Sequence, residues 1–127
     1  MNKIIFLIVL VFVSCNNKKE QKMSQKIKIE FQHFEGCPNG PKLLNNLNEA
    51  IKGIEDSIDF IEEIVDSPEL AKKHNFRGSP TILVNGKDIE GMPMPENPSL
   101  SCRFYSNGLP TSSFIIQYIQ TVLKERN

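Results

Sequence analysis

Residues 26–41 read KIKIEFQHFEGCPNGP, and the spacing of the apolar side chains changes within this stretch. Apolar and polar residues alternate over residues 26–34, which predicts a strand with one apolar face. The run EGCPNGP ends the alternation. Apolar residues then recur at helical spacing over residues 43–54, which predicts an amphipathic helix of about three to four turns. Cys37 therefore lies between a predicted strand and a predicted helix.

Further elements follow on the C-terminal side of this stretch. Alternation predicts a second strand over residues 58–66, and Ser67-Pro68 is typical of a helix start, with serine as the cap. Three elements complete the chain: the β-rich run 81–84, its hairpin partner 87–90 after an Asn-Gly turn, and a last helix that Thr111 or Ser112 caps. The order β-α-β-α-β-β-α predicts an α/β fold, in which a right-handed crossover joins two parallel strands and the hairpin adds antiparallel ones.

Length and composition exclude several classes of protein. A chain of 127 residues without an internal repeat predicts one domain, and 39% apolar with 24% charged residues is typical of a soluble protein. Basic and acidic residues number 15 each, which argues against a nucleic-acid-binding surface. Three cysteines are too few for a disulfide scaffold, and two histidines are too few for a dedicated zinc motif. We therefore expect no cofactor and no metal site.

The N-terminal segment reads as an export signal. Residues 4–13 are ten consecutive apolar residues, too short for the roughly 20 that span a bilayer but sufficient for a signal-peptide core. Ser14-Cys15 at its end resembles the lipobox of bacterial lipoproteins, with Phe12 where such boxes usually carry leucine. The resemblance implies a signal peptide over 1–14, a lipidated Cys15, a flexible tether over 15–25 and a domain over 26–127. An uncleaved anchor and an ordinary secreted protein are the alternatives.

The order of elements, together with two motifs, resembles the thioredoxin-like superfamily over nearly all of residues 26–126. The resemblance implies a minimal thioredoxin-like fold with a four-stranded mixed sheet, and it makes Cys37 the reactive cysteine, since a helix N-terminus favours a thiolate. The motif Gly78-Ser79-Pro80-Thr81 resembles the superfamily's cis-proline signature, which presents backbone groups to a bound polypeptide or thiol. The alternative is a trans proline that starts a strand.

The first strand fits the resemblance imperfectly, because in this fold it should be central and covered on both faces. Lys28, Glu30 and Gln32 make one of its faces polar. The second helix is short, so we expect it to cover that face only partly.

The second thiol departs from the superfamily's pattern. The run Cys37-Pro38-Asn39-Gly40 has glycine where a Cys-x-x-Cys motif has its resolving cysteine. If Cys15 is lipidated, Cys102 is the only other thiol. In the implied fold the strand directions bring Cys37, Pro80 and the loop that carries Cys102 to one end of the sheet. The resemblance thus implies Cys37 as nucleophile, Cys102 as resolving cysteine, and Ser79, Pro80 and Thr81 as a docking surface.

Several other residues have two readings. Pro38, His33 and Arg103 are candidate supporting residues: a protonated His33 would favour a Cys37 thiolate, and Arg103 would stabilise a thiolate at Cys102 or a substrate anion. The alternatives are a strand histidine that faces neighbouring side chains and a solvated surface arginine. The repeat Met92-Pro93-Met94-Pro95 supplies thioethers that suit Cu(I), or else it is a rigid segment over apolar surface.

The motifs FEGCPN, GSPT, VNG and SCRFY together resemble a narrower group of small bacterial thioredoxin-like proteins, some of which carry the label alkylmercury lyase. A lyase of that kind needs cysteines that hold mercury and an acid that protonates the carbon leaving group. No Asp or Glu lies at a spacing that marks it as the acid, although Glu35 is near Cys37.

Three hypotheses follow. The first is a thiol–disulfide protein of the bacterial cell envelope, lipid-anchored and facing the periplasm or outward, with protein or small-molecule thiols and disulfides as partners. The second is thiophilic metal binding (mercury or copper) or organomercurial cleavage by Cys37 and Cys102. The third is a binding module in which a structural Cys37–Cys102 disulfide pins the loop. In each case we expect a monomer that binds no nucleic acid.

Overall fold

The computed structural model describes residues 25–126, and four strands form its central sheet in the order β2-β1-β3-β4. The elements are β1 (Ile27–His33), α1 (Asn39–Ile51), a short 3-10 helix η1 (Glu55–Ser57), β2 (Ile58–Ile64), α2 (Pro68–Lys73), β3 (Thr81–Val84), β4 (Lys87–Asp88) and α3 (Ser112–Glu125). β1 pairs with β2 in parallel and with β3 in the antiparallel sense, and β3 and β4 form the hairpin. This is the mixed α/β sheet of a minimal thioredoxin-like fold, so the predicted fold class is confirmed.

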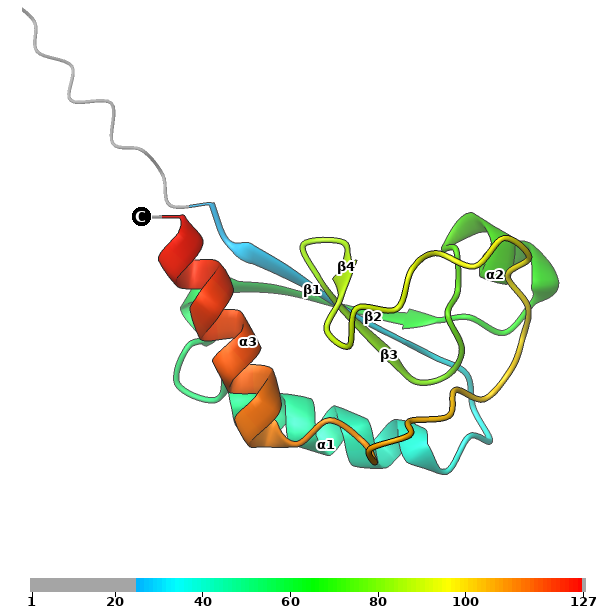
Figure 1. The fold of residues 1–127 in the computed structure, drawn as a ribbon, viewed down its shortest axis with the longest axis horizontal. Helices are drawn as coiled ribbons and strands as arrows, with labels where there is room; N and C mark the ends of the chain where they lie inside the picture. Colours follow the sequence, from blue (N-terminus) through cyan, green and yellow to red (C-terminus); the bar gives the residue numbers. More distant parts are fainter. Residues whose placement is uncertain (1–24, 127) are drawn as a thin grey trace, which may run out of the picture.

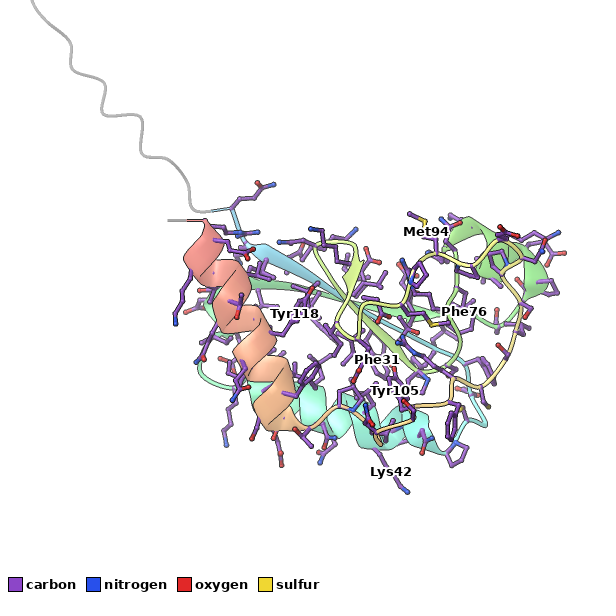
Figure 2. All side chains as sticks on the ribbon, in the orientation of Figure 1. Phe31, Lys42, Phe76, Met94, Tyr105 and Tyr118 are labelled. Atoms are coloured by element: carbon purple, nitrogen blue, oxygen red, sulfur yellow. The ribbon has the colours of Figure 1, made fainter. Side chains whose placement is uncertain are left out.

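The two long helices cover one face of the sheet. Figure 1 shows α1 and α3 together on one side, while α2 lies at the end of the molecule opposite the C-terminus. The apolar residues Ile27, Ile29 and Phe31 of β1 are fully buried in a cluster with side chains of α1, β3 and α3. A second, smaller cluster of Val65, Ala71 and Phe76 packs beside α2. Phe31 and Phe76, labelled in Figure 2, mark the two clusters.

The other face of β1 carries the polar residues of the alternation. Lys28 is exposed, Glu30 is half-buried, and Gln32, near the end of the strand, is only 1% exposed. The α2 helix is six residues long. The polar face is therefore covered near Gln32 and open at Lys28, and cover by α2 stays a prediction.

Helix starts follow the predicted caps. The Ser67 hydroxyl accepts a hydrogen bond from the Leu70 amide, and the Thr111 hydroxyl accepts one from the Phe114 amide, each 3.2 Å long. The end of α1 was predicted at residue 54 but lies at Ile51. Gly53 follows in a left-handed conformation with φ +88°, which turns the chain out of the helix.

The hairpin is shorter than predicted. β4 ends at Asp88 instead of residue 90, because the Asp88 carboxylate accepts hydrogen bonds from the amides of Glu90 (2.9 Å) and Met92 (3.2 Å). These two bonds curl the chain away from β3 and start the long loop that reaches α3. In Figure 1 this loop, yellow to orange, passes α2 and returns along the α1 side of the molecule.

Three predictions concern the N-terminal part of the chain. The signal peptide over 1–14, the lipidated Cys15 and all but the last residue of the 15–25 tether lie outside the described residues. Among residues 25–126, no helix combines the length and the apolar content that crossing a bilayer requires.

Candidate functional site

Cys37 lies in the turn between β1 and α1. Gly36, in a left-handed conformation with φ +92°, turns the chain after the strand, and Pro38 is the N-cap of α1. The Gly40 amide donates to the Cys37 carbonyl over 3.1 Å, which closes the first turn. Cys37 is only 4% exposed. The predicted position of the cysteine, between strand and helix, is therefore the observed one.

The second thiol lies against the first. Cys37 Sγ is 3.1 Å from Cys102 Sγ and 3.3 Å from the carbonyl oxygen of Ser79, to which the Cys37 thiol can donate. Both cysteines are free, since a disulfide bond would bring the sulfurs to about 2.05 Å. The Ser79–Pro80 peptide bond is cis. The structure thus brings together the two cysteines and the proline motif that the sequence assigns to one end of the sheet.

Residues 101–103, which we call the cysteine segment, run beside Ser79 as a short parallel bridge. The Ser79 amide donates to the Ser101 carbonyl, and the Arg103 amide donates to the Ser79 carbonyl, both over 2.8 Å. The Ser79 hydroxyl accepts from the Phe34 amide over 3.2 Å. All the polar groups of Ser79 are therefore engaged within the chain itself.

This pairing bears on the predicted docking surface of Ser79, Pro80 and Thr81. All three residues are buried, and the backbone groups of Ser79 that would pair with a partner already pair with the cysteine segment. The docking role stays a prediction, and a partner polypeptide could use these groups only by displacing the segment.

Arg103 is not the solvated surface arginine that one of its two readings predicts. Its side chain is 7% exposed, and its guanidinium donates to both oxygens of the Asp88 carboxylate, Nη1 over 2.5 Å and Nη2 over 2.9 Å. Nη1 also donates to Thr81 Oγ1 over 3.2 Å. Burial is the largest single influence and opposes the charge of Arg103, but the hydrogen bonds to Asp88 and the charges of Tyr105, Asp88 and Glu90 together outweigh it and raise the pKa of Arg103. The arginine therefore fastens the cysteine segment to the hairpin.

Tyr105 and Gly78 also hold the cysteine segment in place. The Tyr105 hydroxyl donates to the Pro80 carbonyl over 2.6 Å, and its ring lies under the Arg103 guanidinium at 4.6 Å. Tyr105, labelled in Figure 2, packs against the main apolar cluster, and burial raises the pKa of its phenol. Gly78 has φ +103°, and a Cβ there would lie 2.9 Å from the Arg103 Cβ. Only glycine lets the two backbones approach this closely.

The thiol of Cys102 holds its proton more firmly than an ordinary cysteine. Its hydrogen bond with Cys37 raises the pKa of Cys102 above the ordinary 9.0, and both loss of water and the charge of Cys37 act in the same direction. Cys102 nevertheless belongs to the exposed residues, whereas Cys37 is buried. The two cysteines therefore differ in exposure.

His33 and Pro38 lie close to Cys37 in the chain. His33 Nε2 is 2.7 Å from a Glu62 carboxylate oxygen on β2, and its ring is 4.9 Å from the ring of Phe31. His33 is therefore a strand residue that contacts neighbouring side chains, as one of its two readings predicts. Pro38 is exposed and has helical dihedral angles, so it starts α1 without making a side-chain cap.

A hollow of about 240 Å³ opens beside Cys37, and its lining is mostly apolar in area. Its walls are His33, Phe34, Glu35, Gly36, Cys37, Gly40, Pro41 and Leu44. Glu35 is exposed. Part of a small molecule could lie in this hollow, beside the buried cysteine.

The Met-Pro repeat lies on the loop that follows β4. Met92 and Met94 are 40% and 64% exposed, and in Figure 2 Met94 points away from the sheet. The Met92 carbonyl accepts from the Arg77 guanidinium over 2.9 Å. Within residues 25–126 no three His, Cys, Asp or Glu side chains gather as metal ligands, so the two cysteine sulfurs are the donor set of the metal hypothesis.

Sequence reasoning missed Asp88 and Tyr105. Each contacts a residue that belongs to a candidate motif: Asp88 contacts Arg103, and Tyr105 contacts Pro80. A pairing between positions 15 or 25 residues apart leaves no local periodicity. A weak signal exists for Asp88, since an aspartate inside a short apolar hairpin is uncommon and calls for a buried partner.

No protein-family model matches this chain, and a search of the curated proteins finds no match to its sequence. The chemistry of the site therefore follows from its own residues and distances. Beyond the fold itself, the resemblance to the thioredoxin-like superfamily stays a prediction.

Proposed function

We propose that the protein exchanges thiols and disulfides through Cys37 and Cys102. The observation that carries this proposal is the 3.1 Å contact between their sulfurs, which come from positions 65 residues apart. Two thiols at this distance form a disulfide of about 2.05 Å after a small movement and release it again on reduction. Formation of the protein disulfide transfers two electrons to a partner disulfide, and its reduction takes two electrons from a partner thiol pair.

The surroundings of the pair support reversible chemistry. The cysteine segment is held to Ser79 by two hydrogen bonds of 2.8 Å and to Asp88 through Arg103. Cys102 therefore stays beside Cys37 when both are reduced, which raises the effective concentration of one thiol at the other. Gly40 stands where a Cys-x-x-Cys motif has its second cysteine. Cys102 would supply the second thiol from the loop instead.

The proposal extends to the setting of the exchange. A lipidated Cys15 and a tether to residue 25 would hold the domain at a bacterial envelope membrane, where disulfides can form. Membership of the thioredoxin-like superfamily, partners that are thiols or disulfides of proteins or small molecules, and a monomeric state belong to the same proposal. The order of roles that the sequence predicts is Cys37 as nucleophile and Cys102 as resolving cysteine.

The test is turnover of a chromogenic disulfide with reduced glutathione as the electron donor. Cys37→Ser and Cys102→Ser should each abolish turnover, because neither variant can cycle between disulfide and dithiol. Cys15→Ser is the matched control, since it also removes one thiol but should leave turnover unchanged. Turnover that survives in the Cys37→Ser/Cys102→Ser double variant would refute the proposal.

A structural disulfide is the second candidate. The buried ion pair between Arg103 and Asp88 favours it, because it fixes the segment that carries Cys102. A permanent Cys37–Cys102 bond would close a loop between positions 65 apart and stabilise the fold by about 4 kcal/mol in a chain-entropy estimate. It would show no turnover in the assay above, and the disulfide would resist glutathione. Stoichiometric uptake of Hg²⁺ or Cu⁺ that either cysteine substitution removes would instead support the metal hypothesis.

A further inference from the structure

The two sulfurs of the pair differ in what covers them. Cys37 is 4% exposed, although it lies just before α1, where a reactive cysteine would need to meet its partner. Cys102, on the loop, is exposed. A partner that approaches the pair from solvent therefore meets Cys102 first.

The cysteine segment blocks the approach of a partner chain to Cys37. The cysteine segment occupies the amide and the carbonyl of Ser79, so a partner chain cannot pair with those groups while the segment is in place. Arg103 is bound to Asp88, and Tyr105 donates to the Pro80 carbonyl, so side chains fasten the C-terminal end of the segment in addition to its backbone bonds with Ser79. Displacing the segment would strip a buried guanidinium of its counterion, which is costly.

We propose, on the basis of the exchange function proposed above, that the mixed disulfide with the partner forms on Cys102 and that Cys37 is the buried sulfur that leaves and returns. This order reverses the roles that the position of Cys37 predicts from the sequence. It follows from the cover over Cys37 and the exposure of Cys102.

The exchange steps balance in atoms and electrons. A partner thiolate attacks Cys102 Sγ of the oxidised protein, the Cys37–Cys102 bond breaks, and its electron pair goes to Cys37 Sγ as a thiolate. A second partner thiolate then attacks the partner sulfur of the mixed disulfide. The partner disulfide departs, and Cys102 is released as a thiolate that takes up a proton. Two partner thiols are oxidised while the protein disulfide is reduced, and the reverse sequence reduces a partner disulfide.

The raised pKa of Cys102 bears on the first exchange step. In thiol–disulfide exchange the sulfur with the lower thiol pKa is the better leaving group. The hydrogen bond with Cys37 raises the pKa of Cys102, which makes Cys102 a poorer leaving group than an ordinary thiol. Access to the exposed Cys102 favours the attack there, and the raised pKa of Cys102 acts against its own departure in that first step.

The test uses the oxidised protein in a Cys15→Ser background, so that Cys37 and Cys102 are its cysteines. It is mixed with a fluorescent peptide that contains one cysteine, and samples are stopped with acid at increasing times. Digestion and mass spectrometry then locate the attached peptide. We expect it on Cys102, with at least about tenfold less on Cys37. An adduct mainly on Cys37 would overturn the inference and leave the exchange function intact. If the oxidised protein reacts with no peptide thiol, the exchange function and the inference both fall.

Single-cysteine variants give a second measurement in the reducing direction. Reduced Cys37→Ala and Cys102→Ala, both in the Cys15→Ser background, react with a peptide activated as a chromogenic mixed disulfide. Cys37→Ala, which keeps the exposed Cys102, should react about tenfold faster or more. Because alanine at position 102 also removes the sulfur that covers Cys37, the comparison is biased against the expected result. A faster reaction of Cys102→Ala would contradict the assignment.

Discussion

Asp88→Asn tests the anchor of the cysteine segment. The substitution keeps the shape of the side chain and one oxygen for the amides of Glu90 and Met92, but it removes the negative charge beside Arg103. The two side chains are 1% and 7% exposed, so the guanidinium is left charged, buried and without a counterion. Breaking a buried ion pair in this way costs about 3–5 kcal/mol.

This cost is a large share of the about 5–15 kcal/mol that stabilises a typical domain. In urea denaturation the midpoint of Asp88→Asn should fall strongly while the slope stays unchanged. For a domain of this size the loss lowers the melting temperature by about 12 °C or more. Adding Arg103→Met to Asp88→Asn removes the uncompensated charge, so the double variant should be more stable than Asp88→Asn alone.

Lys28→Gln is the matched control. It breaks the ion pair between Lys28 and Glu30, which has the same 2.5 Å separation, but the Lys28 side chain is 49% exposed. Exposed pairs contribute at most about 1 kcal/mol. If Asp88→Asn changes the free energy of unfolding no more than Lys28→Gln does, the anchor is not the buried ion pair described above.

Three further predictions concern the same end of the sheet. Gly78→Ala should destabilise the protein more than Gly91→Ala, since both glycines have positive φ (+103° and +76°) but only at Gly78 does a Cβ meet the cysteine segment, at 2.9 Å; equal urea midpoints would contradict this. Burial raises the pKa of Tyr105 above 10.0, so the stability contributed by its neutral phenol is complete below that pH and is lost as the pH rises through the higher folded value. The stability difference between wild type and Tyr105→Phe should therefore shrink above pH 10.0, and a difference independent of pH would refute the assignment. Cys37→Ala removes the hydrogen bond that raises the pKa of Cys102, so iodoacetamide should alkylate Cys102 faster in the variant at neutral pH; an unchanged or slower rate would count against the shift.

The fold was predictable because its signals are local. The alternation of residues 26–34, the serine and threonine caps and the Asn-Gly turn each act within a few residues, and all three correspond to observed elements. The end of β4 was not predictable from propensity, because a side chain decides it. The Asp88 carboxylate accepts hydrogen bonds from the amides of Glu90 and Met92. The alternation of residues 87–90 gives no sign of these hydrogen bonds.

The site was predictable in its location and not in its connections. The strand directions of the implied fold place Cys37, Pro80 and Cys102 at one end, and the structure brings all three together there. The burial of Arg103 and the pairing of the cysteine segment with Ser79 depend on how a long loop packs, which has no periodic signal. For this reason the sequence identifies the two thiols but not which of them meets solvent.

The most direct test of the Cys37–Cys102 exchange pair is a redox titration of the purified protein. The protein is equilibrated in glutathione buffers of stepped potential, its free thiols are alkylated, and the products are mapped by mass spectrometry. The account predicts a reversible Cys37–Cys102 disulfide with a midpoint between about −120 and −270 mV, the range of exchange proteins. A pair that never forms a disulfide, or one that resists reduction below about −300 mV, would contradict it.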